Sequence, residues 1–354
     1  MRVLSLARIG PALSLILVPA CELQRGDPID GPAFAASDDP VGRDAFPWSD
    51  PVWLGPVVNS SARDWKPSLS PHGLSLYFHS NRGGNFDIWV SRRAGPNCPW
   101  QAPADLGPPV NTPLDDGDVN FTPNGRVLFF SSTGHGGAGA GDIFMARRAD
   151  PNDDFGWGEP VNLGPDVNTA LHESNPVYVA AENGGTLYFD RAEGADPTIG
   201  DIYRVRLRRD GQTRGPAVLV SELSVPGIAD ASAAVRADGR ELIFWSGGAE
   251  GSRPGGVGLA DLWVSTRRHV NDPWSAPQNL GRPVNSEFAE LSATLSHDGR
   301  TLFFTAGRQR GGLGLQDMWM STRGRIDQEI EEGDDEGAKS NDGDDRRCSD
   351  EHDN

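Results

Sequence analysis

The fold is decided by the stretch LSLYFHSNRGGNFDIWVSRR, residues 74–93. It holds two short apolar runs with aromatic residues, separated by a glycine-rich segment, and this pattern is typical of two strands joined by a turn. The pair His72-Gly73 precedes the first run and marks another turn. The second run opens on Asp87-Ile88-Trp89, which is the clearest marker of the unit. The stretch therefore predicts at least two antiparallel strands.

The same unit occurs five times along the chain. Its Asp-aliphatic-aromatic marker recurs at intervals of 55, 59, 60 and 56 residues, as Asp87-Ile88-Trp89, Asp142-Ile143-Phe144, Asp201-Ile202-Tyr203, Asp261-Leu262-Trp263 and Asp317-Met318-Trp319. An apolar pair precedes each marker, as Tyr77-Phe78, Phe129-Phe130, Tyr188-Phe189, Ile243-Phe244 and Phe303-Phe304. Each copy also carries a turn before that pair and divides into four strands. Five such copies predict an all-β, five-bladed β-propeller of four-stranded blades.

The two ends of the repeat predict how the ring closes. The fifth copy ends at Arg323-Gly324, directly after its third strand. The segment Trp53–Asn59 resembles the outer-strand segment of the first copy, Leu106–Asn111. We therefore expect the N-terminal segment to supply the missing outer strand of the last blade.

Composition and charge favour the same class of fold and exclude one class of partner. The 354 residues include 44 Gly and 28 Pro, which suits many short strands joined by turns. The net charge is −18, and residues 327–354 hold 13 acidic and 3 basic residues, a net of −10. This uneven charge predicts a solvated acidic tail over residues 325–354 and argues against nucleic acid as a partner.

The N-terminus reads as an export signal. Residues 1–21 contain a basic lead, an apolar run that is too short to span a bilayer, and the end Val18-Pro19-Ala20-Cys21. This end resembles the bacterial lipobox, which implies a lipid on Cys21. The alternative is an ordinary cleaved signal with an incidental cysteine. Residues 22–47 read as a flexible linker and residues 48–324 as the propeller. We expect a monomer in the bacterial envelope, lipid-anchored in the periplasm or at the outer membrane or cell surface.

The first repeat carries a family resemblance. The segment PSLSPHGLSLYFHSNRGG, residues 67–84, followed by Asp87-Ile88-Trp89, resembles the WD-like (Pro-Asp) repeats in the propeller of TolB. The resemblance spans about residues 53–324. It implies a propeller that acts as a protein-binding scaffold in the envelope. TolB has six blades and a further N-terminal domain, which this chain lacks, so its partners do not carry over.

One acidic residue stands at the start of the first strand in every copy: Asp64, Asp116, Glu173, Asp230 and Glu290. Because the first strand of a blade lines the central channel, the five acids are predicted to ring one mouth of that channel. One interpretation is a binding site for a cation such as Ca²⁺, which prefers oxygen ligands. The alternative is that each acid caps its own turn or pairs with a neighbouring arginine.

Residues that differ between copies are better candidates for specificity than those that repeat. The position after the apolar pair varies, and it holds His79, Ser131, Asp190, Trp245 and Thr305. The loops between the second and third strands are rich in glycine and carry residues such as Arg308. We expect both sets on the face of the acidic ring, where binding to a rigid scaffold is usual.

The sequence offers little support for catalysis. It contains neither a Gly-x-Ser-x-Gly elbow nor a Walker phosphate loop. The main prediction is therefore a non-enzymatic protein that presents its propeller face to an envelope protein or a cell-surface glycan, without a cofactor unless Ca²⁺ binds. The alternative is a glycosidase-like, carbohydrate-active enzyme that uses two acids of the ring. A third possibility is a purely structural lipoprotein.

Overall fold

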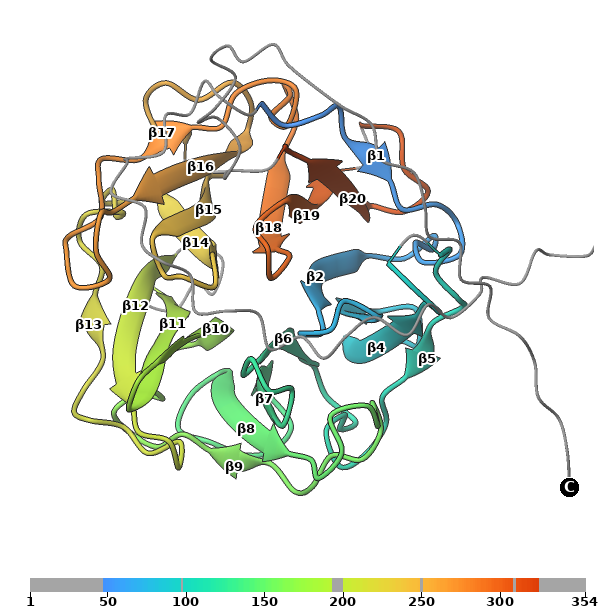
Figure 1. Cartoon of the computed structure of the whole chain (residues 1–354), viewed down its shortest axis with the longest axis vertical. Coiled ribbons are helices and arrows are strands. Elements are labelled where there is room, and N and C mark those ends of the chain that lie inside the picture. Colours follow the sequence, from blue (N-terminus) through green and yellow to red (C-terminus); the bar gives the residue numbers. More distant parts are fainter. Residues whose placement is uncertain (1–46, 97, 193–199, 249–250, 308–309, 325–354) are drawn as a thin grey trace, which may run out of the picture. The chain divides into compact units, whose positions relative to one another are not determined.

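A computed structural model describes residues 47–324, except residues 97, 193–199, 249–250 and 308–309. Over these residues the chain contains no α-helix and forms five four-stranded antiparallel sheets. Figure 1 shows the sheets as five blades around a central axis. The prediction of a five-bladed β-propeller is confirmed.

Each blade runs from an inner strand to an outer one in chain order. Blade 1 holds β2 (Asp64–Leu69), β3 (Ser75–Ser80), β4 (Asp87–Arg92) and β5 (Ala104–Asp105). Blade 2 holds β6 (Asp116–Phe121), β7 (Val127–Ser132), β8 (Asp142–Arg147) and β9 (Val161–Asn162). Blade 3 holds β10 (Glu173–Ala181), β11 (Gly184–Ala192), β12 (Gly200–Leu207) and β13 (Val218–Leu219). Blade 4 holds β14 (Ala229–Val235), β15 (Glu241–Gly247), β16 (Ala260–Thr266) and β17 (Gln278–Asn279).

Blade 5 closes the ring with strands from both ends of the repeat region. It consists of β18 (Glu290–Leu295), β19 (Thr301–Gly307), β20 (Gln316–Thr322) and the N-terminal β1 (Val52–Trp53), which pairs with β20. Asn59 reinforces this junction, because its side chain bonds both the N–H and the C=O of Met318, at 2.7 and 3.2 Å. The prediction that an N-terminal strand completes the last blade is therefore correct.

The core lies within the blades and between them. The second aromatic residue of each apolar pair has no exposed surface: Phe78, Phe130, Phe189, Phe244 and Phe304. Burial of a phenylalanine is worth roughly 1.5–3 kcal/mol, so five of them account for a large part of the stability of the ring. The repeated aromatic pairs thus set the spacing of the blades.

The innermost strands share one irregularity that shapes the axis. Each of β2, β6, β10, β14 and β18 has a shift of register against its neighbour, which is the mark of a β-bulge. One non-glycine residue in each bulge has a φ between 49° and 58°: Lys66, Asp118, Asn175, Ser232 and Ser292. Such a backbone costs on the order of 1–3 kcal/mol and is concentrated at functional sites in proteins. We call these five the bulge residues.

Three sequence predictions lie outside the described residues. They concern the signal segment with Cys21, the linker up to residue 46, and the acidic tail 325–354. In the part of the chain that is described, no helix is long and apolar enough to cross a membrane.

Candidate functional site

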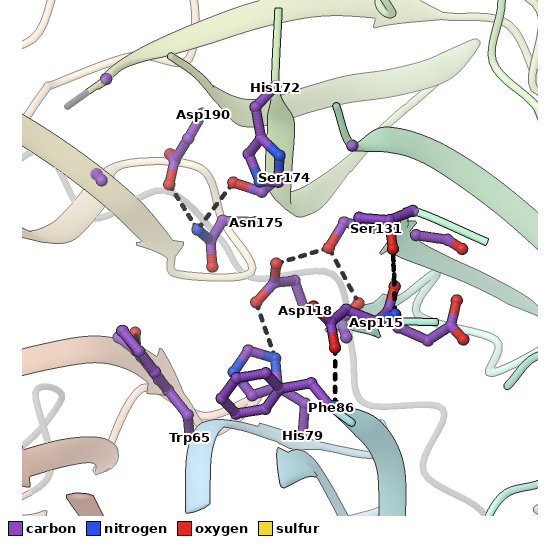
Figure 2. Close-up of a pocket in the computed structure, with 18 of the residues that line it drawn as sticks. Trp65, His79, Phe86, Asp115, Asp118, Ser131, His172, Ser174, Asn175 and Asp190 are labelled. Atoms are coloured by element: carbon purple, nitrogen blue, oxygen red, sulfur yellow. Dashed lines mark hydrogen bonds and ion pairs between the residues drawn. The ribbon is translucent and has the colours of Figure 1, made fainter. Parts of the chain in front are cut away.

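A pocket of about 320 Å³ opens on the axis of the propeller, and all five blades contribute to its wall. This volume lies at the lower end of the range for small-ligand sites. Figure 2 shows its polar side chains, among them Asp118 from β6, Asp190 from β11 and Asn175 from β10. In this view Asn175 lies between the two carboxyl groups. We call this cavity the axial pocket.

Asp118 is held as a carboxylate. Ser131 donates a hydrogen bond to it at 2.6 Å, and His79 Nδ1 lies 3.2 Å from its other oxygen. Burial raises the pKa of Asp118, but His79, the bond from Ser131 and the charge of Lys66 together outweigh burial and hold this pKa well below its usual value. Asp118 is therefore ionised at neutral pH and can act as a base.

The surroundings of Asp190 raise its pKa, whereas those of Asp118 lower the pKa of that residue. It is 5% exposed, and it accepts hydrogen bonds from the Ser232 amide at 2.8 and 3.0 Å and from Asn175 at 2.7 Å. Burial raises its pKa to about 7, although the charge of Lys66 and these hydrogen bonds act to lower it. Asp190 therefore keeps its proton in much of the population at neutral pH and can act as an acid.

Lys66 interacts electrostatically with both carboxyl groups. Its side chain is almost fully buried, and Nζ donates to Ser232 Oγ at 2.5 Å. This bond joins blade 1 to blade 4 across the axis. Burial lowers the pKa of Lys66, while the charges of Asp118 and Asp190 raise it. A lysine in this place supplies positive charge to the site without facing the cavity.

Aromatic side chains form the apolar part of the wall. Trp65, Phe86 and Trp245 line the axial pocket, and the imidazole of His79 packs edge-on against Trp65 and Phe86, with ring centroids at 5.8 and 5.2 Å. Aromatic faces and a few convergent polar groups together are the usual composition of a small-ligand site.

The five acids of the predicted ring are buried, at most 1% exposed, and they have partners of their own. Each accepts a hydrogen bond from a backbone N–H four or five residues earlier: that of Ser60, Thr112, Thr169, Val225 or Ser286. Four also pair with an arginine, as Asp64–Arg82, Glu173–Arg191, Asp230–Arg253 and Glu290–Arg310. The fifth, Asp116, has His135 nearby in place of an arginine.

This arrangement matches the alternative in which each acid caps its own turn and pairs with an arginine. Among residues 47–324 as described, no group of three or more His, Cys, Asp or Glu side chains could hold a metal ion. That Asp64, Asp116, Glu173, Asp230 and Glu290 bind Ca²⁺ stays a prediction. The pairing does not favour it, since four of the five carboxylates already pair with an arginine of their own blade. Asp116 is the one member that lines the axial pocket.

More of the variable positions than of the ring acids line the axial pocket. The structure places His79, Asp190 and Trp245 on the axial pocket, while Arg308 lies outside the described residues. That these residues bind a ligand stays a prediction. The sequence reasoning missed Asp118 and Lys66, although a signal existed. The bulge residues all stand two positions after the ring acid, and this position changes in kind from copy to copy.

Comparisons with known proteins support the fold. No family model matches the chain, and neither does any curated protein. A thermostable family-43 glycoside hydrolase aligns with a TM-score of 0.53 and 14% identity, over 77% of this chain and 92% of the other. The catalytic domain of the GH62 α-L-arabinofuranosidase from Coprinopsis cinerea gives a TM-score of 0.53 and 14% identity, over 78% and 97%. TolB from Acinetobacter baumannii aligns with a TM-score of 0.42 and 14% identity, over 76% of this chain and 56% of the other. So weak a likeness supports no inference.

These comparisons correct the main functional prediction. At 14% identity a structural match shows the fold alone, and this chain is a five-bladed propeller of the kind found in those hydrolases. The matches with the higher TM-scores are enzymes that act on glycosides, not envelope scaffolds. The prediction of a non-enzymatic scaffold is therefore contradicted by the neighbours that these comparisons found.

Proposed function

We propose that the protein is a glycoside hydrolase whose reaction takes place in the axial pocket. The observation that carries this proposal is the pair Asp118 and Asp190, two carboxyl groups in one pocket whose surroundings move their pKa values apart. Such divergence is how a site makes one carboxyl an acid and another a base at the same pH. Four of the ring acids, which the sequence offered for this role, are already paired with arginines and take no part.

The proposed reaction needs only the two carboxyl groups and water. Asp190 gives its proton to the glycosidic oxygen as the bond from that oxygen to the anomeric carbon breaks. Asp118 takes a proton from a water molecule whose oxygen bonds to the same carbon. The products are a free sugar and an alcohol, and the carboxyl groups return to their starting states by proton exchange with solvent.

The remaining side chains have supporting roles. His79 and Ser131 orient Asp118 through the contacts that lower its pKa. Trp65, Phe86 and Trp245 offer flat apolar faces on which the C–H surfaces of a sugar ring can pack. The small volume of the pocket suits one or two sugar units, so we expect cleavage near a chain end or of a side branch.

The test is an activity screen of the purified protein with aryl glycosides and with arabinan, arabinoxylan and other branched polysaccharides. Asp118→Asn and Asp190→Asn should each lower kcat by at least about 100-fold, because each removes one partner of the proton transfer. Asp115→Asn is the matched control, because Asp115 lines the same pocket and accepts a bond from the Phe86 amide that asparagine can also accept. Equal activity in all three variants, or no turnover of any substrate, would refute the proposal.

Location and partners are also proposals. The lipobox-like end at Cys21 supports a lipid-anchored protein of the bacterial envelope, and the proposed reaction supports a glycan partner. Metabolic labelling with a radioactive fatty acid tests the anchor, since Cys21→Ala should abolish incorporation. Persistent labelling of that variant would count against it.

A further inference from the structure

Blade 3 departs from the repeat at its outer edge. In the other four blades a tryptophan stands four residues before the outer strand: Trp48, Trp100, Trp157 and Trp274. In blade 3 the outer strand β13 begins at Val218, and the same count falls on Arg214. Blade 3 thus has a cation where its neighbours have an aromatic ring.

The partner of that tryptophan is missing as well. In the other blades an arginine stacks on the ring at 4.1–4.5 Å from its centroid, as Arg323–Trp48, Arg93–Trp100, Arg148–Trp157 and Arg267–Trp274. The strand registers pair Phe130 with Phe144 in blade 2 and Phe189 with Tyr203 in blade 3, so the counterpart of Arg148 is the buried Leu207. The arginine-on-tryptophan contact that fastens the outer strand elsewhere does not exist in this blade.

A groove of about 220 Å³ lies at this edge. Its wall includes Arg204 and Arg206 from β12, Arg214 from the following segment, and Thr186 from β11. Because Arg204 and Arg206 are two residues apart on one strand, they lie on the same face with a spacing of about 7 Å. The backbone N–H of Arg214 bonds the carbonyl of Arg206, so Arg214 lies beside Arg206 and the groove gathers three guanidinium groups.

These arginines are not neutralised by carboxylates in the part of the chain that the structure describes. Arg206 donates to the Asn271 amide oxygen at 3.3 Å and Arg214 to the Asn183 carbonyl at 2.9 Å, and both bonds leave the charge uncompensated. No described contact pairs Arg204 with an acid. Arg208 and Arg209 follow in the next turn and are exposed. This local excess of positive charge stands in a chain of net charge −18.

We propose that this edge of blade 3, the arginine groove, binds an anionic polysaccharide that carries carboxylate or sulfate groups along its chain. Guanidinium groups match such oxyanions with paired hydrogen bonds. Three guanidinium groups in one groove suit a polymer with repeated anionic groups better than a single small ion. The choice of a glycan rests on the proposed function, but the anion site itself does not. An acidic protein is the competing occupant, and the test decides between them.

The test measures binding of fluorescent oligogalacturonate to the full chain at low salt, with a sulfated oligosaccharide and inorganic phosphate as further probes. A neutral galactan oligomer serves as the uncharged comparison. The variant R204Q/R206Q/R214Q removes the groove's charges, and R126Q/R282Q/R300Q removes three charges from other blades as the matched control. We expect the groove variant to bind oligogalacturonate on the order of 10- to 100-fold more weakly, with the control unchanged and with binding that weakens as salt is raised.

Three outcomes would overturn the proposal. The first is equal loss of affinity in both triple variants, which would mean a general charge effect. The second is no preference for oligogalacturonate or the sulfated probe over galactan. The third is equally tight binding of poly-glutamate, which would assign the groove to an acidic protein. The experiment measures binding and not turnover. Binding of the charged glycan without any hydrolysis would therefore refute the proposed function and still support the arginine groove as an anion site.

Discussion

Replacing Asp190 by asparagine should flatten the dependence of stability on pH. The pKa of Asp190 is about 7 in the folded chain, against about 3.9 for an unfolded aspartate. Between these values the folded state holds a proton that the unfolded state has released. Its stability contribution is therefore complete below pH 4 and is lost as the pH rises towards 7, at about 1.4 kcal/mol per pH unit. From pH 5 to pH 7 the wild-type protein should lose roughly 2–3 kcal/mol through this group.

Urea denaturation at half-unit steps between pH 5 and pH 7 measures this effect as the difference between the wild type and Asp190→Asn. The wild type should lose stability across the range relative to the variant. Asp118→Asn is the matched control. Because the pKa of Asp118 is lowered in the folded chain, this carboxyl group stabilises the protein at pH values above the pKa of an unfolded aspartate. That stabilisation disappears only as the pH falls below about 4, outside the measured range. An Asp190→Asn variant with the wild-type slope would refute the raised pKa and, with it, the assignment of Asp190 as the acid.

Other predictions concern the charges around the site and between the blades. Lys66→Met should raise the pKa of Asp190 above 7, since the lysine charge opposes the effect of burial. NMR titration of the Asp190 carboxyl group would measure this pKa. An unchanged titration would show that the two groups do not interact. Glu173→Gln should destabilise the protein by about 3–5 kcal/mol, because Arg191 loses its buried partner, yet turnover per folded molecule should stay at the wild-type level. A loss of kcat in folded Glu173→Gln would return the ring acids to the reaction. Asp154→Ala should cost a similar amount in urea denaturation, because Asp154 is buried and accepts bonds from Tyr77 and Arg92 of blade 1 and from Arg148 of its own blade, and a cost below 1 kcal/mol would contradict that view.

The repeat made most of the fold predictable. The markers at Asp87-Ile88-Trp89 and its four counterparts fall on the third strand of each blade, and the turn pairs such as Asn124-Gly125 fall between the first and second strands. Even the closing strand at Val52–Trp53 could be found, because its segment resembles the outer strand of the first copy. These features follow from local spacing and alternation, which a single strand or hairpin imposes on its own sequence.

The pairing of the ring acids could not be decided from the sequence, because it depends on contacts in space. The five acids look alike in sequence, and nothing local shows that Arg82, Arg191, Arg253 and Arg310 reach back to four of them. The matching residue in blade 2 is a histidine, which the alternation of strands does not reveal either. The sequence therefore left two interpretations of the acids open, a cation site and capping or pairing, and the structure shows the caps for all five and an arginine partner for four.

The sequence by itself determined the number of blades, the strands within each blade and the closure of the ring. Only the tertiary structure decided which residues meet on the axis. Asp118 and Asp190 lie 72 positions apart and come from different blades, and Lys66 reaches them from a third. Their pKa values depend on burial and on charges across the axis, and these exist only once five blades have closed around a common centre. The physical reason is that strand patterns are local, whereas a site at the hub of a ring is made of contacts between residues far apart in the chain.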